Sequence, residues 1–304
     1  MAEPPDAEAA ELLEAAAAPC WGVRAQRPAP ARDDKVVTAW NGLTVAALAD
    51  AGALWDRADL LEAAARTAGF LLDHAVVDGR LQRTVYADGA TNPGCLDDHA
   101  DLAHGLLRLY DATFDPRWLV AARDLAARIV ELFQDPEEGG FFTAGSDTPA
   151  LVARTRDLED HPSPSGNSQA AWVLARLGDL TGDPELHAAA QRAVALVRTD
   201  MLRFPHAYAQ ALVVADHLAH PGVQVAVVGD PSAQDTAALL AVARAAGPGV
   251  TVACGHPDDA AAVAAAPLLA ERPMVDGRAT AYVCRGSTCD APVTDPDALR
   301  VLLT

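Results

Sequence analysis

Hydrophobic positions in the middle of the chain recur at three- and four-residue spacing, which is typical of amphipathic helices. The pattern occurs in three copies, at residues 46–64, 104–122 and 172–190. Each copy has an apolar run, a short turn that contains aspartate, and a second apolar run. Two helices joined by a short turn form an αα-hairpin, so the pattern predicts three consecutive helical hairpins.

The turns of the second and third copies contain the dipeptides Asp115-Pro116 and Asp183-Pro184. Aspartate is a good N-cap and proline fits the first helical turn, so each dipeptide predicts where the second helix of its hairpin begins. The segments that join the hairpins are long, at 78–89 and 138–168. Loops inserted at the same point of each hairpin gather at one end of the helical layer, and we expect that end to be the binding mouth.

After about residue 221 the pattern changes to short apolar runs that alternate with helical segments. Strands are predicted at 223–230, 250–254 and 279–284. The alternation favours a small parallel α/β unit. We therefore divide the chain into an N-terminal helical and linker segment, a hairpin part and the α/β unit, at residues 1–31, 32–221 and 222–304.

The charge balance excludes some partners. With 23 basic and 42 acidic residues the formal net charge is −19. Such a surface repels phosphate backbones and anionic lipids, so we expect no nucleic-acid partner and no membrane partner. No apolar stretch reaches the roughly 18 to 20 residues of a membrane span, and the acidic N-terminus is unlike a signal peptide. The five scattered cysteines are an odd number, which predicts a reduced, cytoplasmic protein.

Four strings of residues resemble a known family. They lie at 32–43, 164–168, 280–284 and 289–295. The combination is similar to a family of thioredoxin domain-containing proteins that includes spermatogenesis-associated protein 20. The resemblance implies an (α/α) toroid of the six-hairpin glycosidase type, preceded in the family by a thioredoxin-like domain that we do not find in this chain. The expected fold class is therefore mainly α: a partial toroid, of about three and a half hairpins, followed by the small α/β unit.

Trp40 and Asn41 stand at the start of the first helix of the first hairpin. One interpretation is a substrate-binding pair, with Trp40 as a platform for a sugar ring and Asn41 hydrogen-bonded to its hydroxyls. The alternative is a helix capped by Thr38 or Asn41, whose tryptophan packs against its neighbours.

Asp97, Asp98 and His99 open the first helix of the second hairpin and are the candidate catalytic residues, with the carboxylates as general acid and base. Acidic residues also stabilise a helix N-terminus without any catalytic role. Adjacent residues point about 100° apart on a helix, so at most one carboxylate faces the mouth, and we favour Asp98. In the family, aromatic residues usually stand where this chain has Cys95 and His99.

The third hairpin begins after a rigid Pro-Ser-Pro-Ser-Gly turn. Asp160, Ser165 and Asn167 are candidate substrate-binding residues there, although Ser165 is also a natural helix cap. His206 precedes the next helix and is a candidate second proton-transfer group, with a solvent-exposed loop histidine as the alternative. We expect no cofactor and no metal.

Cys284 and Cys289 lie five positions apart after a predicted strand. Reduced structural thiols, a disulfide or redox pair, and a zinc site completed by Cys254 and His256 are the three interpretations. Because only Arg285 nearby is basic, we predict that both thiols are reduced.

Two function hypotheses follow. The first is a carbohydrate-active protein, sugar epimerase-like or glycoside hydrolase-like, with a sugar ligand. The second is a non-catalytic scaffold or redox-associated binding module, so whether the chain is an enzyme stays open. An interrupted toroid exposes apolar edges, so we expect self-association or a separately encoded partner, with a helix at Glu8–Ala18 covering part of one edge.

Overall fold

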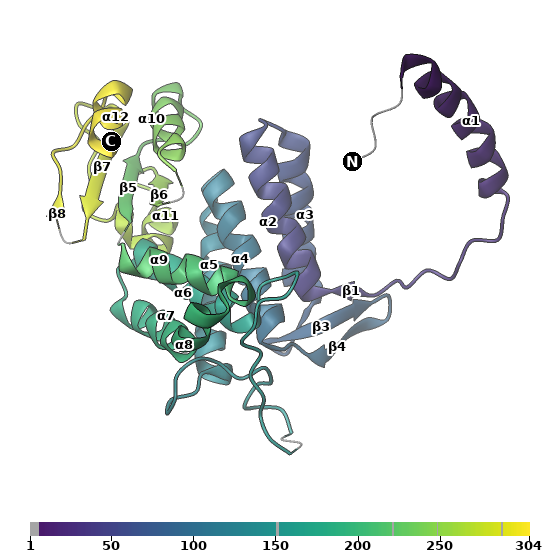
Figure 1. The fold of residues 1–304 in the computed structure, drawn as a ribbon. Coiled ribbons are helices and arrows are strands. Elements are labelled where there is room, and N and C mark those ends of the chain that lie inside the picture. Colours follow the sequence, from purple (N-terminus) through teal and green to yellow (C-terminus); the bar gives the residue numbers. More distant parts are fainter. Residues whose placement is uncertain (1–5, 150–151, 221, 248, 287) are drawn as a thin grey trace. The chain divides into compact units, whose positions relative to one another are not determined.

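The computed structural model describes residues 6–149, 152–220, 222–247, 249–286 and 288–304 (Figure 1). The chain divides into two compact units, Met1–Lys35 and Val36–Thr304. The larger unit has the predicted fold class, a mainly helical arrangement of hairpins followed by a small α/β unit. Every helix in the described residues is too short or too polar to cross a membrane.

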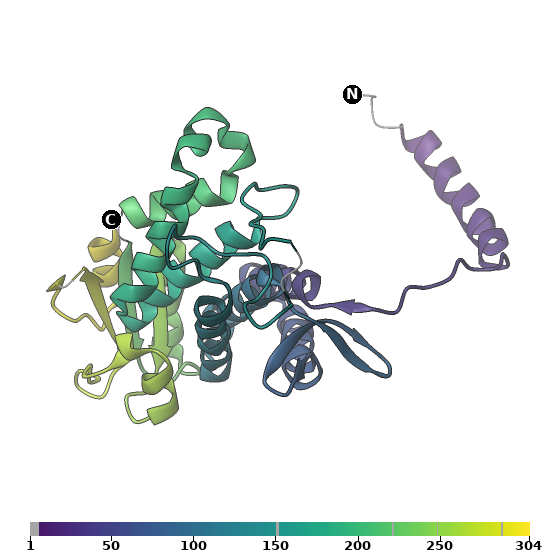
Figure 2. The same cartoon turned by 90° about the horizontal axis from the view of Figure 1, so that it is seen from below.

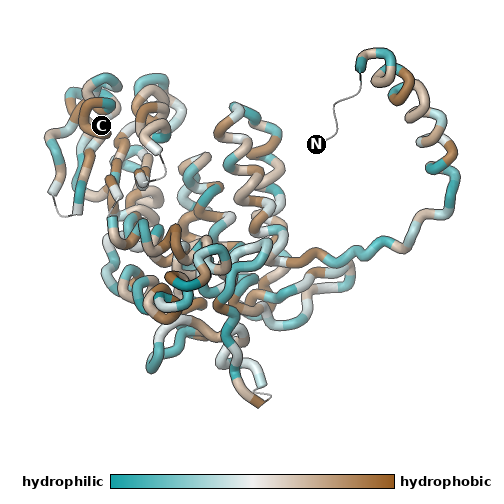
Figure 3. Tube along the Cα trace, in the orientation of Figure 1, coloured by the Kyte–Doolittle hydropathy of each residue, from teal (hydrophilic) through white to brown (hydrophobic). Residues whose placement is uncertain are grey.

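In the first unit, helix α1 (Ala7–Ala25) confirms the helix predicted at Glu8–Ala18. The Asp6 carboxylate caps it by accepting a hydrogen bond from the Ala9 backbone N–H at 2.8 Å. No residue of α1 is buried, and it carries both hydrophobic and hydrophilic residues (Figure 3).

The three predicted hairpins are all present. They are α2 (Thr38–Leu54) with α3 (Ala58–His74), α4 (Leu96–Thr113) with α5 (Pro116–Phe133), and α6 (Gly166–Thr181) with α7 (Pro184–Leu196). The caps predicted from Asp-Pro are confirmed, because Asp115 accepts from the Arg117 N–H and Asp183 accepts from the Glu185 N–H. Then follow α8 (Arg198–Arg203), the 3₁₀ turn η1 (Pro205–Ala207) and α9 (Ala209–Ala219).

The first helices of the hairpins form a row in which α2 packs on α4, α4 on α6, and α6 on α9. The second helices α3, α5 and α7 pack on their partners. Two glycines allow the closest of these contacts. A Cβ atom at Gly42 would lie 2.6 Å from the Asp101 backbone, and one at Gly105 would lie 2.4 Å from the Gly42 carbonyl oxygen.

The loop between the first two hairpins forms a small antiparallel sheet with the segment that precedes the first hairpin. It contains β1 (Val36–Val37), β2 (Val76–Val77), β3 (Arg80–Tyr86) and β4 (Gly89–Pro93). Strand β3 pairs with each of the other three. Because β1 runs directly into α2, this pairing places the side chains of β3 beside the N-terminus of α2.

The α/β unit differs from the prediction in strand direction. It contains β5 (Val223–Val228), α10 (Gln234–Ala245), β6 (Val250–Gly255), α11 (Ala260–Ala265), η2 (Pro267–Leu269), β7 (Thr280–Arg285), β8 (Thr288–Cys289) and α12 (Pro296–Leu303). The sheet order is β6-β5-β7-β8. Strands β5 and β6 are parallel as predicted, but β7 and β8 are antiparallel to their neighbours, so the sheet is mixed. The chain enters β7 at Thr280, opposite Val228 at the end of β5, and must therefore run back along it.

The α/β unit packs against the hairpin helices (Figure 2). Arg244 of α10 donates to the backbone oxygens of Asp111 and Ala112 at the end of α4. Asp179 of α6 accepts from the Thr251 hydroxyl of β6 at 3.1 Å. One continuous hydrophobic core spans both parts.

Candidate functional site

The N-termini of α2, α4, α6 and α9 lie next to one another, as the hairpin pattern predicts. Asp98 of α4 accepts from the Ala39 N–H of α2 at 3.2 Å. A Cβ atom at Gly166, the first residue of α6, would lie 3.2 Å from the Asp97 nitrogen. Asp160 accepts from the N–H groups of Ser165 and Gln210 and so joins α6 to α9. We call this end of the helical row the rim.

Asp98 is completely buried at the rim. Its carboxylate accepts from the Cys95 N–H at 2.9 Å and thereby caps its own helix. Through Ala39 it also caps α2, which makes the predicted caps wrong: Thr38 donates to the Gln82 oxygen and Asn41 to the Val37 oxygen. The prediction that Asp98 is the carboxylate that faces the mouth is also wrong, because its side chain is completely buried.

Asp97 is the carboxylate that solvent reaches. It forms an ion pair with Arg83 of β3 at 3.1 Å, and the two side chains are 36% and 39% exposed. The same Arg83 Nη1 atom lies 2.9 Å from the buried carboxylate of Asp98. One guanidinium therefore bridges an accessible carboxylate and a buried one.

Two carboxyl groups of the rim have raised pKa values. Burial, reinforced by the charge of Asp97, raises the pKa of Asp98 from 3.8 to about 6. Burial next to Asp97 and Asp98 raises the pKa of Asp101, one helical turn further on, to about 8. No described residue donates a hydrogen bond to the Asp101 carboxyl. The sequence reasoning missed Asp101, although its three-residue spacing from Asp98 was a signal that both lie on one helix face.

His99 is held rather than free. Its ring is buried, and its Nδ1 and Nε2 atoms lie 2.8 Å from the Cys95 oxygen and 3.0 Å from Arg80 Nη1. Arg80 is paired in turn with Asp147 at 2.6 Å. Burial lowers the pKa of His99 to about 4, so the ring is neutral at physiological pH. These contacts make His99 a support for the loop and not a mobile proton carrier.

Trp40 lies next to the Ala39 contact with Asp98 and is 65% exposed. A large aromatic ring in the first turn of α2 is thus open to solvent, one residue after the Ala39 N–H that donates to Asp98. This is the accessible position that a sugar platform needs.

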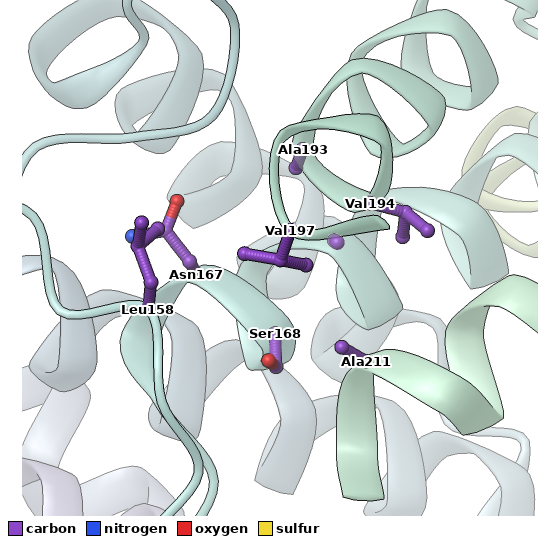
Figure 4. A pocket seen from close by; sticks show the side chains of 8 residues that line it. Leu158, Asn167, Ser168, Ala193, Val194, Val197 and Ala211 are labelled. Carbon is purple, nitrogen blue, oxygen red and sulfur yellow. The ribbon is translucent and has the colours of Figure 1, made fainter. Parts of the chain in front are cut away.

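Ser165 and Asn167 are committed to internal hydrogen bonds. Ser165 caps α6 through the Ser168 N–H, while Asn167 accepts from the Phe141 N–H and donates to the Phe141 oxygen. Asn167 and Ser168 line a hollow of only about 10 Å³ (Figure 4), room for about one water molecule and not for a sugar. Asp160 likewise accepts two backbone hydrogen bonds. Asp160, Ser165 and Asn167 therefore act as structural groups of the rim.

His206 lies in η1 and is exposed. The structure records no contact between it and the Asp97–Asp98 cluster within the described chain. The rim therefore does not bring the two predicted proton-transfer groups together.

Cys95, Asp97 and Asp98 each offer a ligand atom within 4.8 Å of the others, which is a possible metal-binding arrangement. Arg83 already places a positive charge 2.9 to 3.1 Å from both carboxylates. A cation would have to displace that guanidinium, so the donor set fits a metal poorly.

A much larger cavity, of about 520 Å³, lies at the opposite ends of α2 and α4, against the α/β unit. Its polar lining includes Arg108, Arg176, Arg244, Asp50 and Asp111, with Trp172 among the apolar residues. No motif in the sequence pointed to this cavity, because its walls come from helices and a strand far apart along the chain.

Cys284 and Cys289 are joined in a disulfide across the β7–β8 pair. The prediction of two reduced thiols is wrong for this structure, since the register of the hairpin sets the two cysteines directly opposite each other. The zinc interpretation is excluded for these sulfurs by the same bond.

Fold and site together define a mainly helical hairpin protein with an acidic cluster at one rim. No protein-family model matches the chain. Spermatogenesis-associated protein 20 of Mus musculus is 34% identical over 293 residues, 92% of this chain and 37% of the relative. The Homo sapiens protein is 33% identical over 305 residues, 96% of this chain and 39% of the relative. The chain is thus homologous to spermatogenesis-associated protein 20, and it spans less than half the length of these relatives.

Solved structures give weaker likenesses. Cellobiose 2-epimerase from Spirochaeta thermophila has a TM-score of 0.45 at 16% identity, covering 56% of this chain and 45% of that chain. A GH76 α-mannanase from Bacteroides thetaiotaomicron has a TM-score of 0.42 at 16% identity, covering 57% and 46%. D-mannose isomerase has a TM-score of 0.41 at 16% identity, covering 53% and 42%. These likenesses concern part of the backbone alone.

Proposed function

We propose that this chain is a carbohydrate-active protein that binds a sugar at the rim, on Asp97, Arg83 and Trp40. The observation that carries the proposal is the accessible Asp97–Arg83 ion pair, anchored by the buried Asp98. The exposed Trp40 follows directly after Ala39, whose N–H donates to the same Asp98. The position of the sugar rests on these side chains and not on the likeness to solved structures.

The chemistry of the three side chains suits a sugar. The carboxylate of Asp97 accepts hydrogen bonds from hydroxyl groups, and the guanidinium of Arg83 donates to them in a fixed plane. The Trp40 ring offers an apolar face against which the C–H side of a sugar packs. The buried carboxylate of Asp98 holds the Arg83 guanidinium in place, and Asp98 is therefore a positioning residue.

Proton transfer fits the rim better than glycoside hydrolysis. Retaining glycosidases hold their two carboxyl groups roughly 5 to 5.5 Å apart and inverting ones roughly 6.5 to 9.5 Å apart. Asp97 and Asp98 have oxygens within 4.8 Å of each other and share one guanidinium, so no glycosidic bond fits between them. An epimerase-like reaction needs a base that removes a carbon-bound proton and a proton donor, a side chain or water, that returns one to the opposite face; Asp97 is the base in the proposal.

Ligand-observed NMR with a panel of mono- and disaccharides tests the binding step. We expect saturation transfer to at least one sugar with the unchanged chain and a loss of at least tenfold in affinity for Asp97→Asn. Asp73→Asn, an exposed position on α3, makes the same charge change away from the rim and is the matched control. Equal binding by both variants, or no binding of any sugar, would overturn the proposal.

A second candidate, a non-catalytic binding module, is favoured by the 520 Å³ cavity. Its volume lies in the range of small-molecule sites, roughly 300 to 1,000 Å³. Three arginines and two aspartates line it, so its side chains carry a net charge of +1 in a chain of net charge −19. Together with Trp172 this lining suits a small molecule with an acidic group and an apolar body.

The two candidates are separable with one further pair of variants. Arg244→Ala removes a cavity guanidinium, while Arg66→Ala removes an exposed arginine of α3. Binding of an aromatic carboxylate or phosphate that falls only with Arg244→Ala supports the binding module. Sugar binding that falls only with Asp97→Asn supports the rim.

A further inference from the structure

The disulfide in the α/β unit joins two sulfurs with different access to solvent. Cys284 on β7 is 2% exposed, whereas Cys289 on the edge strand β8 is exposed. Cys289 therefore offers the more accessible side of the bond to an external thiolate. Attack on Cys289 would make Cys284 the leaving group.

A fixed positive charge stands beside both sulfurs. Arg272 Nη2 lies 3.5 Å from Cys284 Sγ and 3.7 Å from Cys289 Sγ. The guanidinium is held from two sides, because its Nη1 donates to the Ala270 oxygen at 3.1 Å and its Cζ lies 5.8 Å from the ring centre of Tyr282. A cation next to a sulfur stabilises its thiolate form.

The other nearby charges do not cancel this one. Asp290 follows Cys289, but its carboxylate is paired with Arg285 at 2.9 Å. The sequence analysis counted only Arg285 as a basic neighbour of the cysteines. Arg272 was missed because it lies twelve residues before Cys284 and reaches the sulfurs only through the fold.

The Cys284–Cys289 disulfide stabilises the fold little as a cross-link. The two cysteines are five positions apart, and β7 and β8 already pair at Arg285 and Thr288. Closing so short a loop constrains the unfolded chain less than a long loop would. A purely stabilising role therefore does not explain an arginine placed at both sulfurs.

We propose that Cys284 and Cys289 form a redox-active pair that exchanges with a dithiol reductant, with Arg272 as the residue that positions and stabilises the leaving thiolate. The reductant's thiolate attacks Cys289 Sγ, the Cys284–Cys289 bond breaks, and Cys284 leaves as a thiolate beside Arg272. The reductant's second thiol then attacks the mixed disulfide and releases Cys289. Two electrons pass to the pair and the dithiol becomes a disulfide.

Reduction by dithiothreitol, quenched with an alkylating reagent and read by mass spectrometry, tests the proposal on the native chain. We expect Arg272→Ala to slow formation of the doubly alkylated species about tenfold and Arg272→Lys to restore most of the rate. Arg278→Ala, an exposed arginine in the same connection, is the matched control and is expected to leave the rate unchanged.

Circular dichroism under the same conditions shows whether each variant is folded. Cys289→Ser is expected to leave a folded chain with Cys284 as a free thiol that is alkylated faster in the presence of Arg272 than in the Arg272→Ala background. The proposal is overturned if Arg272→Ala reduces at the rate of the unchanged chain. It is also overturned if the pair stays oxidised until the chain unfolds.

Discussion

The pKa of Asp101 is raised further than that of its rim neighbour Asp98. Its carboxyl group is buried in the contact between α2 and α4, one turn from Asp98. A carboxyl group held there is protonated at neutral pH, because its pKa is raised to about 8. The protonated Asp101 therefore holds a proton near the accessible Asp97, where an acid–base reaction can use it. At high pH the buried group must ionise, which lowers the stability of the fold.

The Asp101→Asn variant measures that cost. The folded pKa of Asp101 lies above the unfolded value, so the stability that this group contributes is lost as the pH rises from about 4 to about 8. Asparagine resembles the protonated acid and does not titrate. Relative to the unchanged chain, the variant should gain about 4.5 kcal/mol in free energy of unfolding between pH 4.5 and pH 8.5.

Urea unfolding at the two pH values gives the comparison, with Asp73→Asn as the exposed control. A difference between variant and unchanged chain that is the same at both pH values would mean that Asp101 is not a raised, buried acid.

At the residue scale, the sequence predicts those contacts that lie within a few positions along the chain. The caps at Asp115 and Asp183 follow from their Asp-Pro dipeptides. The cap of α2 does not, because it comes from Asp98, 59 positions away. Thr38 and Asn41 have the right chemistry for a cap but find other partners once β3 lies alongside.

At the scale of elements, the contact between α2 and α4 depends on glycine. In the Gly42→Ala variant the new methyl group would meet the Asp101 backbone at 2.6 Å, and backbone cannot move aside cheaply. We expect a loss of about 2 kcal/mol in the free energy of unfolding, even after the gain in helix propensity. Thermal and urea unfolding measure it.

Gly69→Ala is the matched control, since nothing lies within 4 Å of a Cβ atom at that position of α3. Better helix propensity should raise its free energy of unfolding by up to about 1 kcal/mol. If Gly42→Ala were also stabilising, the two helices would not be as close as described.

Asp179 connects four elements. It accepts from His187 of α7 at 3.0 Å, from His217 of α9 at 2.8 Å and from Thr251 of β6 at 3.1 Å. These hydrogen bonds hold the pKa of Asp179 well below its usual range, and the same carboxylate raises the pKa of His187. The hairpins and the α/β unit are therefore joined by a buried ionic contact.

Asp179→Asn should lower the free energy of unfolding by about 3 kcal/mol, because it leaves buried donors facing an uncharged amide. The loss should be larger at pH 6 than at pH 9. His187 has a raised folded pKa, so its contribution is present at low pH and disappears as the pH rises through that value. Urea unfolding of Asp179→Asn and of the exposed control Asp216→Asn tests both statements, and a loss independent of pH would contradict the second.

The pattern of the chain was sufficient for the identity of the elements and not for their direction. The apolar residues of β5, β6 and β7 predict that these segments are strands. They do not predict whether a strand runs parallel or antiparallel to its neighbour. The antiparallel entry of β7 depends on where the chain emerges after η2, which is a tertiary property.

At the scale of the whole molecule, α2 presents apolar side chains to solvent. Leu54, the last residue of α2, and Trp55, which follows it, are 78% and 66% exposed. They lie along one edge of the helical row, where the sequence analysis expected an uncovered side. Our prediction that self-association or a partner covers this edge is unchanged.

Light scattering on the purified chain should give a mass above the 31.6 kDa of one copy. Changing Leu54 to Glu together with Trp55 to Ser should lower that mass toward one copy, because charge and loss of the indole ring disfavour an apolar contact. Val301→Glu alters an apolar residue of similar exposure on α12 and is the control. A stable single copy that binds no hydrophobic dye would show that the edge needs no cover.

The measurement that tests the central claim most directly is proton exchange on a bound sugar. A sugar selected by the binding panel is incubated with the chain in D₂O, and its proton NMR spectrum is followed with time. We predict loss of the signal of one carbon-bound proton with the unchanged chain and with Asp73→Asn, and a rate at least a hundredfold lower with Asp97→Asn. A sugar that binds at the rim and keeps all its carbon-bound protons would contradict acid–base chemistry at Asp97.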